Sequence, residues 1–154
     1  VYILFVLAVF IIVFLIDLKY GLIPFVILIP SSVITLMYLV ITQPLLVLPH
    51  LFSALGAGGF FFLIYFLTKG RGMGFGDVVL ASFLGLLLGF PGIVIALYAA
   101  FLTGAVVSLI LILSGKKKMK GGTIPFGPFL ILGAFLAFFW KDTLLSLVTI
   151  FLLR

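Results

Sequence analysis

Two aspartates stand out because acidic residues are scarce in this chain. The 154-residue sequence contains three acidic residues, all of them aspartates. Asp17 closes an apolar run in FIIVFLIDLKYGLIP, and Asp77 follows Gly74 and Gly76 at the start of another apolar run, in GMGFGDVVLASFLG. Two carboxyl groups that share one proton can activate water and protonate a leaving amine, which is how aspartic proteases cleave amides. The two aspartates therefore predict amide hydrolysis, provided that the fold brings their side chains together.

The elements that must position these aspartates are apolar helices. Hydrophobic residues make up 66% of the chain and charged residues 8%, whereas soluble domains contain roughly 45–50% and 25% of these classes. Apolar runs of about twenty residues recur along the chain, and such runs cross membranes as helices. The sequence predicts an all-α, polytopic integral membrane bundle that forms a single domain over residues 1–154. Because Val1 already lies inside an apolar run, a preceding residue or segment is left open.

We expect about six transmembrane helices. They cover residues 1–18, 22–41, 51–67, 78–90, 93–113 and 124–140. The remaining stretch, 143–153, is too short to cross the bilayer alone, so a partial or interfacial helix is expected after a break at Lys141 and Asp142. Asp142 is expected to be an interfacial charge, and His50 a loop residue between the second and third spans.

Small residues at intervals of four positions predict close helix packing. Gly85 and Gly89 form one such pair, and Ala100, Gly104 and Ser108 form a second series. Small residues let helix backbones approach closely within a membrane. We expect these faces to pack within the bundle rather than between two copies of the chain.

Basic residues indicate which ends of the helices face the cytosol. Lys19, Lys69, Arg71 and the lysines at 116–120 fall in loops that six alternating spans place on one side, whereas loops 42–50 and 90–92 contain no Lys or Arg. Short loops rich in Lys and Arg stay cytoplasmic. The first span ends, and the fourth begins, on this side. The sequence therefore predicts that Asp17 and Asp77 lie at the same depth, at the cytosolic boundary.

The residue types that are missing exclude several kinds of chemistry. With no cysteine and a single histidine, the chain offers no thiol nucleophile, no disulfide and no cluster of His and Cys metal ligands. The net charge of +6 is concentrated in loops, so it indicates membrane topology rather than nucleic-acid binding. We expect no metal, no organic cofactor and no nucleic-acid partner.

Three blocks, in this order, resemble the type IV prepilin peptidases, which are membrane aspartyl proteases of the GxGD type. They are IDLKYGLIP, GMGFGDVVLASFLG and GGTIPFGPFLILGA. The resemblance implies that Asp17 and Asp77 are the catalytic pair, and that the substrate is the leader of a type IV prepilin, pseudopilin or preflagellin. It also implies a prokaryotic inner membrane, with cleavage on the cytosolic side. Many members carry a domain with paired Cys-x-x-Cys motifs and methylate the new N-terminus; without cysteine, these 154 residues give no support for methylation.

Four further residues are candidates for substrate binding. Gly74 and Gly76 are expected to permit unusual backbone angles and close approach of a substrate backbone beside an aspartate that caps the following helix. Pro125 and Gly127 are expected to line the cleft, because non-helical backbone at membrane depth is tolerated where it lines a cavity.

Three alternatives are left open. A GxGD protease of the presenilin or signal-peptide-peptidase kind would carry a Pro-Ala-Leu motif, whereas Pro125 is followed here by Phe126 and Gly127. A proton- or cation-coupled transporter would use its acids near the bilayer midplane, whereas both aspartates are predicted at the boundary. The third alternative is an inactive membrane scaffold without enzymatic or transport activity. The precursor that is cleaved, the protonated aspartate and the number of subunits are left open.

Overall fold

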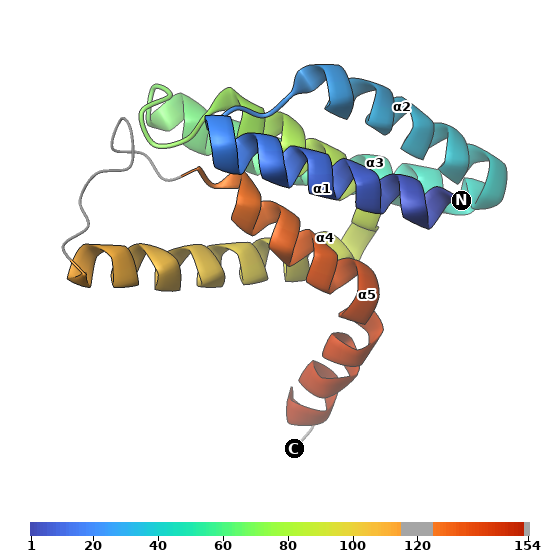
Figure 1. The fold of residues 1–154 in the computed structure, drawn as a ribbon. Coiled ribbons are helices and arrows are strands. Elements are labelled where there is room, and N and C mark those ends of the chain that lie inside the picture. Colours follow the sequence, from blue (N-terminus) through green and yellow to red (C-terminus); the bar gives the residue numbers. More distant parts are fainter. Residues whose placement is uncertain (115–124, 153–154) are drawn as a thin grey trace.

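The described part of the protein is a bundle of helices. The computed structural model describes residues 1–114 and 125–152 (Figure 1). In chain order the elements are α1 (Tyr2–Tyr20), α2 (Phe25–Thr42), the 3-10 turn η1 (Pro44–Leu46), α3 (Val47–Leu67), α4 (Phe75–Leu113) and α5 (Gly127–Leu152). Four helices in these ranges are long and apolar enough to cross a membrane, and Gly127–Trp140 is a shorter apolar helix. The prediction of an all-α, polytopic membrane bundle is confirmed.

The turn between α1 and α2 places Asp17 at one end of the bundle. Gly21 ends α1 in the left-handed conformation (φ 64°, ψ 31°), and its backbone N–H donates to the Asp17 carbonyl oxygen at 2.7 Å. Glycine adopts this conformation without the steric cost of a Cβ. Pro24 then precedes α2. Its missing N–H costs nothing there, because N–H groups at the start of a helix have no acceptor within the helix. The chain therefore reverses within a few residues, and Asp17 stays in the last turn of α1.

A bend divides α4 into two arms. Gly89 (φ 61°, ψ −177°) and Phe90 (φ −87°, ψ 139°) have non-helical backbone angles, at the place where the sequence predicts a break. Beyond the bend the second arm returns toward the end at which α4 begins (Figure 1). The first arm begins at Phe75, three residues before the predicted start at Val78, which puts Asp77 inside the helix.

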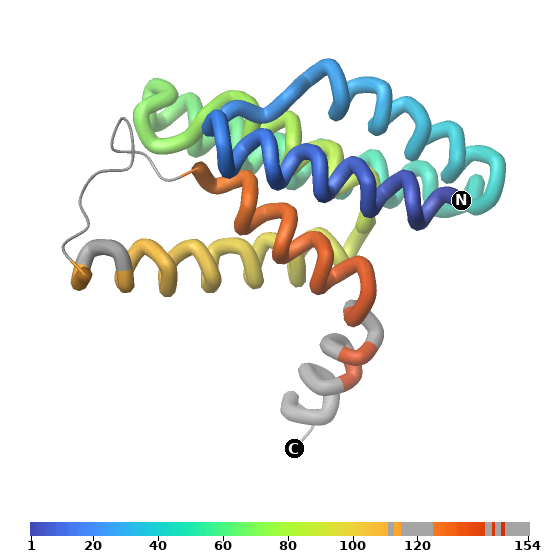
Figure 2. The backbone as a smooth tube through the Cα atoms, in the orientation of Figure 1, coloured from blue at the N-terminus to red at the C-terminus, as the bar shows by residue number. Residues whose placement is uncertain are grey.

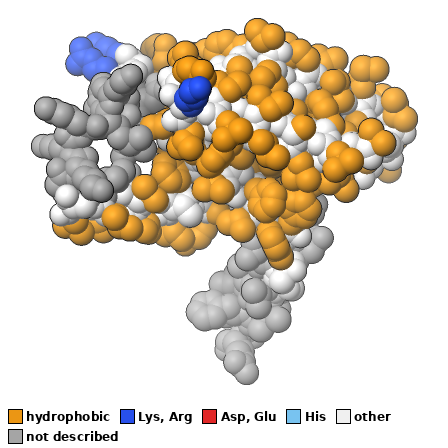
Figure 3. Space-filling model, in the orientation of Figure 1, with side chains coloured by type: hydrophobic (Ala, Val, Ile, Leu, Met, Phe, Trp, Pro, Cys, Tyr) orange, Lys and Arg blue, Asp and Glu red, His pale blue; other side chains and the backbone are white. Residues whose placement is uncertain are grey.

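The predicted cytosolic ends of the helices lie together. The end of α1, the start of α2, the loop after α3, both ends of α4 and the start of α5 gather at one end of the bundle (Figure 2). On the face drawn in Figure 3, the Lys and Arg side chains also gather there, and most of the remaining described surface is hydrophobic. The lysines at 116–120 lie outside the described residues.

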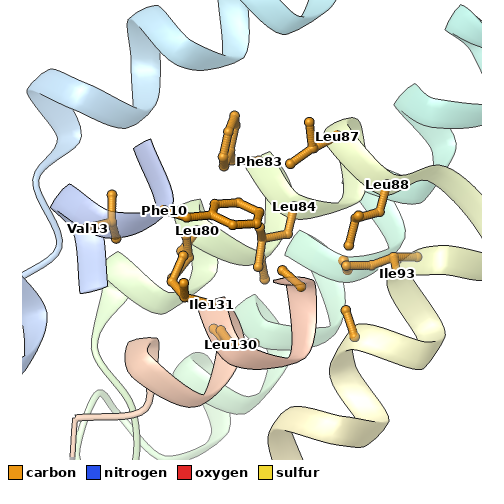
Figure 4. Packing of buried hydrophobic residues seen from close by; sticks show 14 of the residues in the cluster. Phe10, Val13, Leu80, Phe83, Leu84, Leu87, Leu88, Ile93, Leu130 and Ile131 are labelled. Carbon is orange, nitrogen blue, oxygen red and sulfur yellow. The ribbon is translucent and has the colours of Figure 1, made fainter. Parts of the chain in front are cut away.

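The first arm of α4 forms the centre of the core. Its Leu80, Phe83 and Leu84 are at most 1% exposed, and they pack with Val13 of α1 and Leu130 of α5 (Figure 4). Because this arm carries Asp77 at its start, its burial on several sides gives that aspartate a rigid base.

Glycines allow α3 and α4 to pack closely. A Cβ added at Gly85 would lie 2.5 Å from the Ser53 carbonyl oxygen and 2.7 Å from Ala54 Cα. A Cβ added at Gly89 would meet the ring of His50, whose Nδ1 lies 2.7 Å from the Leu86 carbonyl oxygen. The expectation that Gly85 and Gly89 pack within the bundle is confirmed.

Two sequence expectations about α3 and α5 are wrong. His50 is not a loop residue, because α3 begins at Val47 and the His50 ring is held by the α4 backbone. The last helix does not stop near Trp140, because α5 continues to Leu152. A charged pair alone does not end a helix whose backbone hydrogen bonds can continue through it.

Gly85→Ala is expected to destabilise the bundle by about 1–3 kcal/mol, because its methyl group would have to displace α3 backbone. The free energy of unfolding in detergent measures this effect. Gly56→Ala is the matched control, since a Cβ added at Gly56 has nothing within 4 Å. An equal loss in the two variants would contradict the packing described for α3 and α4.

Candidate functional site

A cavity opens where α1, α4 and α5 meet at the predicted cytosolic end. Its volume is about 360 Å³, and both Asp17 and Asp77 line it. The rest of the wall comes from the linker between α1 and α2, from Phe25 at the start of α2, from the loop before α4 with the first two residues of α4 (residues 70–76), and from Pro125 and Phe126 before α5. Segments far apart in the sequence thus converge around the two predicted aspartates.

Asp17 is a buried carboxyl group with an unsatisfied oxygen. The residue is 3% exposed, and among the described residues Oδ2 has no hydrogen-bond partner. The Gly127 backbone N–H faces the carboxyl group, and a Cβ added at Gly127 would overlap Oδ2. Most buried polar atoms in proteins have a hydrogen-bond partner, so an exception calls for an explanation. This oxygen is buried against Gly127, so it does not contact solvent in the cavity.

Asp77 lies in the first turn of α4 and is 7% exposed. Its Oδ2 accepts a hydrogen bond from the Gly74 backbone N–H at 3.2 Å, and its own N–H donates to the Gly74 carbonyl oxygen at 3.1 Å. This exchange resembles the half of a capping box in which the third helical residue bonds back to the N-cap. The expectation that Asp77 is itself the N-cap is wrong, because α4 starts two residues before it.

The two carboxyl groups belong to one site. Both side chains line the same cavity. The prediction that the fold returns Asp77 to the end of the bundle where Asp17 lies is therefore confirmed.

Ile23, in the linker between α1 and α2, links the surroundings of both aspartates. Its Cβ lies 2.8 Å from a Cβ added at Gly76, and its Cδ1 lies 3.3 Å from a Cβ added at Gly127. Gly76 therefore serves close packing rather than an unusual backbone angle, since it is not among the glycines with positive φ. The sequence pattern predicts no role for Ile23; its position next to Pro24 in the first motif is the available signal.

The start of α5 is held by aromatic packing. The Phe126 ring centroid lies 6.0 Å from that of Phe61 and 5.1 Å from that of Phe101. Gly104 leaves space for this ring, because a Cβ added there would come within 3.3 Å of it. Pro125 lines the cavity as predicted, whereas Gly127 is not among its lining residues and packs against Asp17 instead.

The loop between α3 and α4 covers one side of the cavity. Lys69 (φ 50°) and Gly70 (φ 71°) are both left-handed, and the Gly70 N–H donates to the Tyr65 carbonyl oxygen at 2.9 Å. After this turn, Arg71 lines the cavity together with Gly74 and the two aspartates. The sequence pattern indicates only a role in membrane topology for Arg71. In the described ranges, no group of three or more His, Cys, Asp or Glu residues is arranged to hold a metal ion.

Comparisons with known proteins identify similar sequences. Residues 4–109 match the Type IV leader peptidase family. The chain is similar to a prepilin leader peptidase/N-methyltransferase of Legionella pneumophila, with 37% identity over 84 residues, which cover 54% of this chain and 29% of that protein. The protein of the same name from Pseudomonas aeruginosa is 32% identical over 91 residues, which cover 59% of this chain and 31% of the relative. The one from Bacillus subtilis is 34% identical over 92 residues, which cover 58% and 36%. The matched segment thus spans about a third of these relatives. No solved structure matches the chain.

Gly127→Ala is expected to cost about 1–3 kcal/mol of folding free energy, because the methyl group would overlap the Asp17 carboxyl group. In an Asp17→Ala background this obstacle is absent, so most of the cost should disappear. A double-mutant cycle of unfolding free energies in detergent measures the coupling, expected to be at least about 1 kcal/mol. The same cost in both backgrounds would show that Gly127 does not pack against Asp17 as described.

Proposed function

The chain belongs to the Type IV leader peptidase family, and we propose that it is a membrane aspartic endopeptidase of the GxGD type, with Asp17 and Asp77 as its catalytic pair. The observation that carries this proposal is that the two buried carboxyl groups line one cavity at the end of the apolar helices. Residues 1–154 would together form a single peptidase domain.

The proposed reaction is general acid–base hydrolysis of a peptide bond. One carboxylate takes a proton from a water molecule while the water oxygen attacks the carbonyl carbon of the peptide bond. The C–N bond then breaks as the other carboxyl group protonates the leaving nitrogen. Both aspartates line the cavity in which this water would lie. The hydrogen bond from Gly74 holds Asp77 in place while the proton moves.

The proposed substrate is the N-terminal leader of a type IV prepilin, pseudopilin or preflagellin. The names of the relatives state leader cleavage for those proteins, and the apolar helices suit a substrate that is itself anchored in the bilayer. The basic residues at the cavity end favour a cytosol-facing site in a prokaryotic inner membrane. The substrate backbone would lie against Gly74, Gly76 and Pro125. Gly127 would position Asp17 by packing against its carboxyl group.

Asp17→Asn and Asp77→Asn are each expected to lower prepilin cleavage by about 10²–10⁴-fold, because each removes one of the two groups that transfer protons. Leader removal is measured by mass spectrometry in membranes that contain the chain and a type IV prepilin. Folding is checked in parallel by thermal unfolding in detergent.

Asp142→Asn is the matched control. Residue 142 lies fifteen positions beyond Gly127 along α5, about 22 Å at the helical rise, so cleavage should be unchanged. Wild-type cleavage rates in either the Asp17 or the Asp77 variant would refute the catalytic pair. Flux of ions across vesicles that depends on these aspartates, without cleavage by the wild type, would instead favour the transporter alternative.

A further inference from the structure

The aspartate cavity has one basic residue in its wall. Apart from Asp17 and Asp77, Arg71 carries the only polar side chain among the described lining residues, and the others are glycines or have apolar side chains. Arg71 is exposed, whereas the two aspartates are 3% and 7% exposed. Arg71 therefore lies at the opening of the cavity, and the two carboxyl groups lie deeper. Where polar groups are few among apolar walls, they usually determine which ligand a cavity accepts.

Tyr65 holds both ends of the loop that carries Arg71. A Cβ added at Gly70 would lie 3.1 Å from Tyr65 Cε2, and the ring centroids of Tyr65 and Phe75 lie 5.6 Å apart. The Arg71 backbone N–H donates to the Thr68 carbonyl oxygen at 3.0 Å. These contacts fix the backbone of Arg71 beside the cavity, so its side chain acts from a defined position.

The Arg71 guanidinium is available to a ligand. In the ranges that the structure describes, this side chain forms no hydrogen bond or ion pair with the two aspartates or with any other residue. Arginine stays charged at physiological pH. A peptide that fills the cavity opening removes water from this charge, which is costly unless the peptide supplies an anion. The anion that best matches the planar guanidinium in a peptide is a carboxylate, which accepts two parallel hydrogen bonds from it.

We propose that Arg71 is a specificity-determining residue, which binds an acidic side chain of the peptide that is cleaved in the cavity. The inference rests on the proposed function and adds a side-chain preference to it. A peptide bond held by Asp17 and Asp77 must continue in a chain that leaves through the opening, past Arg71. An Asp or Glu side chain at that point gains a charge-assisted ion pair, whereas a Lys or Arg side chain is repelled.

A lipid phosphate is the other anion available at a membrane boundary. Lys69, two residues earlier in the same loop, is exposed and is not among the lining residues of the cavity. It therefore has the position expected for a contact with lipid headgroups. Arg71 differs from Lys69 in lining the cavity, so Lys69 is the matched control for Arg71.

The preference can be measured with precursors that differ by one charge. In a type IV prepilin, the acidic residues next to the scissile bond are first replaced by amides, and Glu or Gln is then placed at successive positions on both sides of that bond. At one or two adjacent positions, Glu should raise kcat/KM of the wild type by about tenfold over Gln. This gain should vanish in Arg71→Gln, persist in part in Arg71→Lys and persist in full in Lys69→Gln.

Charge reversal gives a second test of the same contact. In the Arg71→Glu variant, the precursor with Lys at the selected position should be cleaved faster than the precursor with Glu. A residue that only supports the fold would instead lower the cleavage of all precursors alike.

Three outcomes would overturn the role of Arg71 and leave the proposed function standing. These are a wild type that cleaves without a charge preference at any position, a preference that survives Arg71→Gln, and equal losses for all precursors in the Arg71 variants.

Binding of labelled precursors to the Asp77→Asn chain in detergent separates the two proposals. A wild type that cleaves nothing, together with Glu-dependent binding that Arg71→Gln abolishes, would refute the proposed function and support the role of Arg71. The absence of both cleavage and Glu-dependent binding would refute both.

Discussion

The contact between Gly127 and the Asp17 carboxyl group is the constraint on which the rest of the site depends. Because Gly127 has no side chain, the start of α5 can lie directly against the last turn of α1. This brings Pro125 and Phe126 to the wall of the aspartate cavity. It also aligns the apolar faces of α1 and α5 below that cavity. A methyl group at residue 127 would separate the two helices and displace the carboxyl group.

Two other features hold this contact in place. Ile23 packs toward Gly76 and Gly127, so the linker between α1 and α2 joins the starts of α4 and α5. The Phe126 ring packs with Phe61 and Phe101, and this packing anchors the residue that precedes α5. The aspartates thus belong to rigid helices whose ends are fixed by packing, as precise placement of reacting groups requires.

Much of the fold, and the common location of the two aspartates, could be predicted from the sequence. Long apolar runs determine where membrane helices lie, and the Lys and Arg residues of short loops determine which ends share a side, so the common location of Asp17 and Asp77 followed from counting spans. The roles of Ile23 and Gly127 could not be predicted, because they depend on contacts between loops from different helices. Helix periodicity carries no information on such contacts. The position of Asp77 as the third residue of α4 could not be predicted. The start of a helix depends on its capping geometry, and the glycines before Asp77 do not indicate that geometry.

The shared location of the two aspartates can be measured directly. Since the chain has no native cysteine, an Asp17→Cys/Asp77→Cys variant can be treated in membranes with a short bifunctional thiol reagent, and compared with an Asp17→Cys/Asp142→Cys variant. If both aspartates line one cavity, the first pair should be bridged in high yield and the second should not. Bridging of the 17–77 pair at no more than the level of the 17–142 pair would contradict a joint site.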